Sequence, residues 1–334
     1  MATTMHSTSE DVQVSPRRVA VIDIARGIAL VAMAIYHFTW DLEFFGYADP
    51  GMTAYGNWRL FARCIASSFL FLVGVSLVLA HAKGIRWPGF WRRLAMVVAA
   101  ALAITAATWV ATPDSFIFFG ILHQIALASV LGLAFLRLPP LLTLAVAALV
   151  IAAPNYLRAD LFNHPALLWI GLSTFNPRSN DFVPLFPWFG AVLAGIGAAG
   201  LASRADLFGK LAQLQPGRWS RPVGFFGRHS LAFYLIHQPV LISLVWAYAQ
   251  IFPATIETRE TGFLRSCQVS CEQSRDTDFC SRYCVCMLDD LQKDNSLDRI
   301  YAGDKSTDLR AHIGDTAQMC TARTDGEMPM GGAQ

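Results

Sequence analysis

The segment of residues 19–40 is long and apolar enough to cross a lipid bilayer, yet it carries three ionisable side chains, Asp23, Arg26 and His37. A spanning helix needs about 20 mostly apolar residues, and each ionisable group at bilayer depth costs several kcal/mol. On a helix Arg26 and His37 lie on nearly the same side, roughly 16 Å apart, with Asp23 one turn before Arg26. The segment therefore predicts a span whose polar stripe faces protein or water.

Two readings of this stripe are open. In a structural reading, Asp23 pairs with Arg26 near the cytoplasmic headgroups, and His37 reaches the opposite interface. In a functional reading, the stripe joins two further histidines of apolar segments, His123 and His237, in a polar cavity. A lone histidine in a span is often only a hydrogen-bonded contact between helices. Three histidines in three spans are difficult to place against lipid, so the pattern favours the cavity.

The composition also indicates a membrane protein. Of the 334 residues, 54% are hydrophobic and 15% are charged, whereas soluble domains carry about 25% charged residues. The first 18 residues lack the apolar core of a signal peptide, and no basic run with interleaved aromatic residues indicates nucleic-acid binding. We expect an all-α, polytopic integral membrane helical bundle. Its seven predicted spans are residues 19–40, 60–80, 93–111, 116–136, 139–153, 185–201 and 230–252.

The charges of the loops predict the orientation of the chain. The loop between the second and third segments has four basic residues and no acidic one, and the loop between the sixth and seventh has five basic residues and one acidic one. Because Lys and Arg are enriched in cytoplasmic loops, we expect a cytoplasmic segment 1–18, a transmembrane domain 19–253 and a tail 254–334 in the periplasm. The expected location is the inner membrane.

The predicted tail differs from the rest of the chain. Residues 254–334 hold 9 Lys and Arg against 14 Asp and Glu, whereas residues 1–253 hold 17 against 10. Six of the seven cysteines follow residue 266, in two C-x3-C pairs with two further cysteines. A helical hairpin would join Cys267 to Cys284 and Cys271 to Cys280. A zinc site and free thiols remain alternatives. From about Gln292 onward the charged sequence predicts disorder.

Five stretches of the sequence carry a resemblance to a known family. They are RVAVIDIARGIALVAMAIYHFTWDLEFFG, FLFLVGVSLVLA, FGILHQIAL, PLFPWFGAVLAGI and FGRHSLAFYLIHQPVL, which together cover about residues 17–245. This ensemble resembles the membrane acyltransferases related to heparan-alpha-glucosaminide N-acetyltransferase, especially an uncharacterised bacterial branch. The motif of an acid, Arg-Gly and a histidine eleven residues after the arginine is also similar to the wider sugar O-acyltransferase group. The better-studied relatives have ten or more spans.

The resemblance implies an activity. Such proteins move an acyl group, here expected to be acetyl, from cytoplasmic acyl-CoA to a sugar or glycan acceptor across the membrane. The motif histidine, the proposed base of the O-acyltransferases, corresponds to His37, and the motif arginine corresponds to Arg26. Asp41 follows His37 at i+4, where a carboxylate is expected to orient the imidazole.

Acyl transfer also needs positive charge near the thioester or its phosphates, and groups that hold the acceptor. The residues expected to bind the donor are Arg26, Lys83, Arg86, Arg92 and Arg93. The residues expected to contact the acceptor are Asp23, His123, Asp181, Trp188 and His237. No metal is expected.

Two other classes of function fit the same residues. In a transporter or proton-coupled channel the Asp, Arg and His side chains would carry protons or bind an anion. The sequence has no visible internal repeat, which many transporters have. A membrane sensor or assembly factor would act through the tail. A homo-oligomer is compatible with each of these functions.

Overall fold

The computed structural model describes residues 19–49, 51–81, 84–214, 217–218, 220–254, 259–304 and 306–326. The chain forms two compact units: Met1–Asp41 with Gly51–Val245, and Leu42–Pro50 with Trp246–Gln334. Every regular element in the described residues is helical. The expected all-α fold is therefore confirmed.

Each of the seven predicted spans contains a helix. Five helices are long and apolar enough to cross a membrane, and two are shorter. The five are α1 (Ala20–Phe44), α2 (Gly56–His81), α3 (Trp87–Ala111), α6 (Leu185–Arg204) and α9 (Ser230–Ile251). The shorter two are α4 (Ile121–Gly132), extended by η3 (Leu133–Phe135), and α5 (Pro140–Ala152), extended by η4 (Ala153–Asn155). Helices suit this environment because they satisfy their own backbone hydrogen bonds without water.

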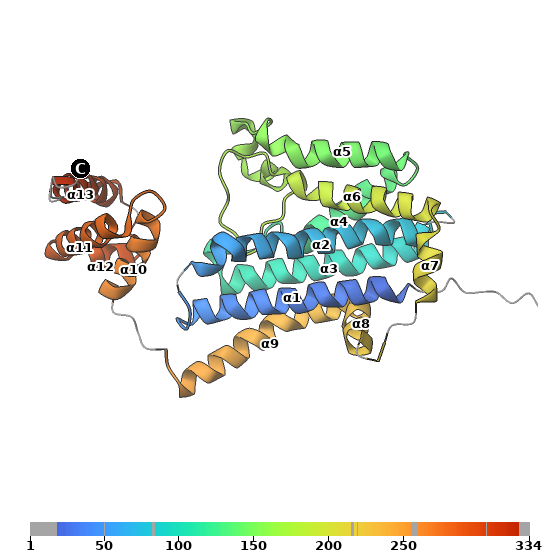
Figure 1. Cartoon of the computed structure of the whole chain (residues 1–334), viewed down its shortest axis with the longest axis horizontal. Coiled ribbons are helices and arrows are strands. Elements are labelled where there is room, and N and C mark those ends of the chain that lie inside the picture. The colour runs from blue at the N-terminus through green and yellow to red at the C-terminus, as the bar shows by residue number, and fades with distance from the viewer. Residues whose placement is uncertain are drawn as a thin grey trace, which may run out of the picture. The chain divides into compact units, whose positions relative to one another are not determined.

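The connections carry shorter helices. Two of them, α7 (Leu207–Gln213) and α8 (Ser220–Arg228), lie in the basic loop before α9. The other connections contain 3-10 helices: η1 (Met52–Ala54), η2 (Pro113–Ser115), η5 (Asp160–Asn163) and η6 (Pro165–Ile170). In Figure 1, α6 lies between α2 and α5, and it contacts both.

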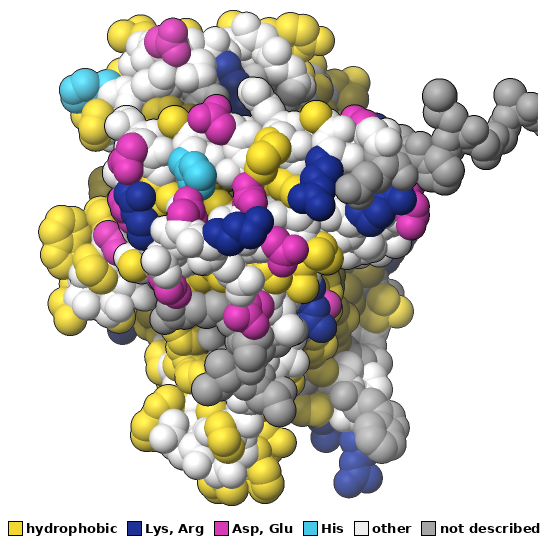
Figure 2. Space-filling model, turned by 90° about the vertical axis from the view of Figure 1, so that its left-hand side faces the viewer, with side chains coloured by type: hydrophobic (Ala, Val, Ile, Leu, Met, Phe, Trp, Pro, Cys, Tyr) yellow, Lys and Arg dark blue, Asp and Glu magenta, His cyan; other side chains and the backbone are white. Residues whose placement is uncertain are grey.

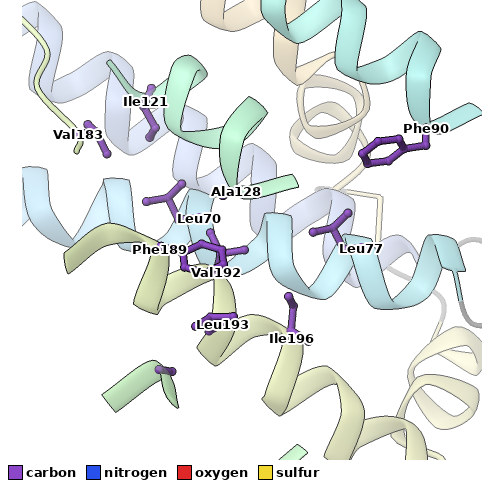
Figure 3. Packing of buried hydrophobic residues seen from close by; sticks show 11 residues of the cluster. Leu70, Leu77, Phe90, Ile121, Ala128, Val183, Phe189, Val192, Leu193 and Ile196 are labelled. Atoms are coloured by element: carbon purple, nitrogen blue, oxygen red, sulfur yellow. The ribbon is translucent and has the colours of Figure 1, made fainter. Parts of the chain in front are cut away.

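The centre of the first unit is the contact between α2 and α6. A Cβ atom on Gly74 would collide with the Val192 carbonyl oxygen, and one on Gly195 would collide with the Phe71 carbonyl oxygen. The two glycines thus let the backbones approach closely, as small residues do between membrane helices. Leu70 and Val192, fully buried, fill the adjoining space (Figure 3).

Large apolar side chains cover much of the outer surface of these helices. Val110 is 82% exposed, Leu149 is 70% exposed and Leu141 is 69% exposed. Figure 2 shows acidic and basic side chains interspersed over one region, with hydrophobic side chains dominating other parts of the same view. Apolar exposure on this scale is expected of helices that face lipid.

The second unit contains the cysteine-rich tail. Its helices are α10 (Arg259–Cys271), α11 (Thr277–Lys293), α12 (Ser296–Tyr301) and α13 (Thr307–Gly326). Disulfides join Cys267 to Cys284 and Cys271 to Cys280, the two pairs that the spacing predicts. A third disulfide, between Cys286 and Cys320, was not predicted.

The prediction of disorder from Gln292 onward is wrong for residues 296–326 apart from the undescribed position 305. These residues include all of α12 and α13, and Leu297, Leu309 and Cys320 are buried. The segment is indeed poor in large apolar residues. It packs nevertheless, because α13 lies against α11 and the Cys286–Cys320 disulfide ties the two together.

Candidate functional site

Two histidines from different spans meet near one end of α1. The ring centroids of His37 in α1 and His237 in α9 are 5.0 Å apart, in an edge-on arrangement. An apolar layer holds the helices in this position. Its buried members are Leu30, Met33 and Ile65, and side chains of α9 pack against them. The fold thus brings together two of the three histidines that the sequence placed in spans.

Asp41 and Gln238 join α1 to α9 beside the histidines. The Gln238 Nε2 donates a hydrogen bond of 2.7 Å to Asp41 Oδ1, and Asp41 is fully buried. The i+4 spacing predicted that Asp41 orients His37. Among the described residues, the hydrogen-bond partner of Asp41 is instead Gln238, which the sequence reasoning missed. The only signal for Gln238 was its place directly after His237.

The tautomer of His237 follows from its hydrogen bond. Its Nδ1 lies 2.7 Å from the Tyr234 carbonyl oxygen. A carbonyl oxygen can only accept, so Nδ1 carries the proton, and Nε2 of the neutral ring is a proton acceptor. His237 is 7% exposed. Its acceptor nitrogen is therefore held in a fixed position inside the protein.

Arg26 occupies the other end of the stripe on α1. Its guanidinium forms an ion pair of 3.4 Å with Asp23, as the structural reading of the sequence proposes. It also donates a hydrogen bond to the Ser76 hydroxyl of α2. Ser76, a buried polar residue in the middle of an apolar stretch, was not singled out from the sequence.

A cavity of about 780 Å³ adjoins this end of the unit. Helices α2, α3 and α4 line it with mainly apolar side chains, and its polar side chains include Ser76, Arg86 and Arg93. Trp87 and Phe90 form part of its wall. Of the other predicted donor-binding residues, Arg92 is exposed and does not line this cavity, and Lys83 lies outside the described residues. Asp23 lines a second, smaller cavity.

His123 and Asp181 support the start of α4. The Gly120 N–H donates to His123 Nδ1 at 3.2 Å, and Thr105 Oγ1 lies 3.2 Å from Nε2 of the same ring. The Ile121 N–H donates to Asp181 Oδ2 at 2.8 Å. Both side chains thus satisfy backbone groups at a helix N-terminus. Burial raises the pKa of Asp181 to about 6, although the bond from Ile121 opposes this.

Trp188 packs against the hydrophobic core around α6, although it was expected to contact the acceptor. The predicted residues therefore fall into three groups. His37, His237 and Asp41 meet at one end of α1, and Arg26 and Asp23 lie at the other. His123 and Asp181 lie at the start of α4, and Trp188 packs against the core around α6.

Comparison with known proteins decides the family. The family model described as heparan-alpha-glucosaminide N-acetyltransferase, catalytic, matches residues 18–239. The chain belongs to this family. The match contains both ends of the α1 stripe and stops before the cysteine-rich tail, and it indicates a transferase of the membrane acetyltransferase type. No curated protein and no solved structure matches the chain.

Proposed function

We propose that the protein transfers an acyl group, expected to be acetyl, from cytoplasmic acyl-CoA to a sugar or glycan acceptor on the far side of the membrane. One observation carries this proposal. A single helix, α1, presents His37 against His237 at one end, and at the other presents Arg26, bonded to Ser76 in the wall of an arginine-lined cavity. A donor and an acceptor that approach from opposite sides need this separation of sites.

The cavity of about 780 Å³ suits the donor. Arg86 and Arg93 supply charge for phosphate groups, which bind guanidinium groups strongly. Trp87 and Phe90 offer aromatic faces to an adenine ring. The apolar remainder of the wall fits the long arm that carries the thioester. Ser76 connects this wall to Arg26.

The chemistry proposed for the other end is general base catalysis. His37 removes the proton from the acceptor hydroxyl or amine as its oxygen or nitrogen attacks the thioester carbonyl carbon. The new C–O or C–N bond forms, the C–S bond breaks, and the thiolate of CoA leaves. Leu30 and Met33 lie between Arg26 and His37 along α1 and are buried. The thioester must pass this apolar layer to reach the base.

The orientation proposed for the chain places its N-terminus in the cytoplasm and its tail in the periplasm, across the inner membrane. The alternation of basic and acidic loops supports this orientation. The three disulfides of the tail give further support, because disulfides persist in oxidising compartments.

Purified protein in detergent, incubated with labelled acetyl-CoA and a panel of free sugars, tests the activity. We expect labelled acetyl sugar from the wild type and none above background from His37→Ala. The pair Arg86→Ala and Arg93→Ala should raise the KM for acetyl-CoA. Proton or solute flux into proteoliposomes that contain the protein, without acyl transfer, would favour a transporter instead.

A further inference from the structure

Three buried atoms near His37 have no hydrogen-bond partner among the described residues. They are Asp41 Oδ2, His237 Nε2 and Gln238 Oε1. They come from two helices whose side chains are already joined by the bond from Gln238 to Asp41 and by the ring contact between His37 and His237. The side chains that carry the three atoms therefore form one connected group, or cluster, where α1 meets α9.

All three atoms are hydrogen-bond acceptors. The proton of His237 is fixed on Nδ1 by the Tyr234 carbonyl oxygen, so Nε2 accepts. The amide of Gln238 directs its N–H group at the Asp41 carboxylate, so its oxygen points elsewhere and accepts. Asp41 Oδ2 is a carboxylate oxygen. The cluster therefore offers three hydrogen-bond acceptors, and the Asp41 carboxylate gives it a negative charge.

A buried acceptor without a partner costs about 1–3 kcal/mol, and three in one place are a large cost for a structure to carry. The other atoms of this kind in the described residues belong to Gln124, which has one donor and one acceptor, and to Arg282 in the tail. Neither forms a cluster of a single chemical kind. The cost at Asp41, His237 and Gln238 is best explained by a ligand that supplies donors.

We propose that Asp41, His237 and Gln238 form a binding site that accepts hydrogen bonds from neighbouring O–H or N–H groups of the acceptor and holds them beside His37. This inference rests on the proposed function and names the part of the acceptor that the site recognises. The recognised unit is neutral or cationic and carries several donors, as a sugar ring with adjacent hydroxyl groups does. A carboxylate or sulfate group at this position is excluded, since it brings further acceptors and a like charge.

The first test measures binding without the donor. Titration of the purified protein with glucose, glucosamine or glucuronate, followed calorimetrically, should show binding of the first two and weak or no binding of glucuronate. Gln238→Met keeps the length of the side chain and removes its acceptor atom, together with the Nε2 group that donates to Asp41. We expect it to weaken the binding of glucose about tenfold, the loss expected for one hydrogen bond.

A second variant separates the two kinds of donor. Asp41→Asn keeps the shape of the side chain and removes its charge. It should therefore weaken the binding of glucosamine, which carries an ammonium group, more than the binding of glucose, which carries only hydroxyl groups. The matched control is Gln250→Met, an exposed glutamine on the same helix, which should bind each sugar as the wild type does. Melting temperatures in detergent show whether each variant is folded.

The second test measures turnover. In Gln238→Met the KM for the sugar should rise about tenfold, whereas the KM for acetyl-CoA and kcat should change less than about threefold. An unchanged sugar KM and unchanged sugar binding in folded Gln238→Met would overturn the inference and leave acyl transfer standing. Conversely, Gln238-dependent sugar binding in a protein with no transferase activity would support the site and refute the proposed function.

Discussion

His37 is the side chain on which the proposed chemistry depends most. Removing a general base typically lowers the rate about 10²–10⁴-fold. His37→Ala should therefore lower acetyl transfer by that factor in a steady-state assay. It should leave expression and membrane insertion intact, because alanine is less costly in a span than histidine. The matched control is His123→Ala, which removes the contacts of His123 with Gly120 and Thr105. This variant should lower the melting temperature but change kcat far less than His37→Ala does.

The Asp181 carboxyl should make the stability of the folded protein depend on pH. Its carboxyl has a pKa of about 6 in the folded protein against an ordinary value of about 4. The folded state therefore holds this proton more tightly than the unfolded state. The resulting stabilisation is present below about pH 4 and is lost as the pH rises through about 6.

Thermal melting in detergent between pH 4 and 8 checks this dependence. Asp181→Asn, which can still accept from Ile121, should flatten that part of the profile. Asp181→Ala should lower stability at pH 4 by about 0.5–2 kcal/mol, the usual loss for a helix cap, and should also flatten that part of the profile. A wild-type profile that Asp181→Asn leaves unchanged would contradict this reading of the carboxyl.

The sequence could predict some of these residues but not their partners. The spacing on one helix predicts that Asp23 lies within reach of Arg26 and that His37 lies about three turns beyond Arg26. Ser76 and Gln238 lie on other helices, and a hydropathy pattern does not say how a lipid-exposed helix is rotated against its neighbours. The same limit explains Asp41, which bonds to Gln238 across the helix interface and not to His37 along α1.

At the scale of helices, the close contact of α2 and α6 is the feature most sensitive to substitution. A Cβ atom on Gly195 would collide with the backbone of Phe71 in α2. Gly195→Ala should destabilise the protein by about 1–3 kcal/mol, the usual cost of overpacking. Gly89→Ala in α3 is the control, because nothing lies near its Cβ position. Equal melting temperatures for the two variants would contradict the packing.

The helices themselves were largely predictable, since each predicted span is an apolar stretch between polar loops. The boundaries were less so. The fourth span was expected from residue 116, but α4 begins at Ile121. There Asp181, from a loop distant in sequence, accepts a hydrogen bond from the Ile121 N–H. The helices α12 and α13 were missed, because a disulfide and a contact with α11 stabilise a segment whose composition alone favours disorder.

At the scale of the whole molecule, the tail is expected to depend on its disulfides. The bond between Cys286 and Cys320 closes a separation of 34 residues. Loss of such a bond from a small domain typically costs about 2–5 kcal/mol. Cys320→Ser should therefore release α13 to limited proteolysis around residues 302–306, as seen by mass spectrometry. Cys64→Ser is the control, because Cys64 is the free cysteine of the described residues.

The proposed orientation predicts where the tail can be labelled. A membrane-impermeant maleimide, added to intact spheroplasts of a Cys64→Ser background after mild reduction, should modify the tail cysteines. Labelling that appears only after the inner membrane is permeabilised would place the tail in the cytoplasm and reverse the predicted topology.

The function proposed for the protein is transfer of an acyl group across the membrane by a site that contains His37. Proteoliposomes that enclose glucosamine and glucose, with labelled acetyl-CoA added only outside, test it directly once the fraction with the N-terminus outward is known. We expect labelled acetyl sugar inside the vesicles for the wild type and a roughly 10²–10⁴-fold lower yield for His37→Ala. Near-wild-type transfer by a folded His37→Ala protein, or no transfer by the wild type to either sugar, would contradict it.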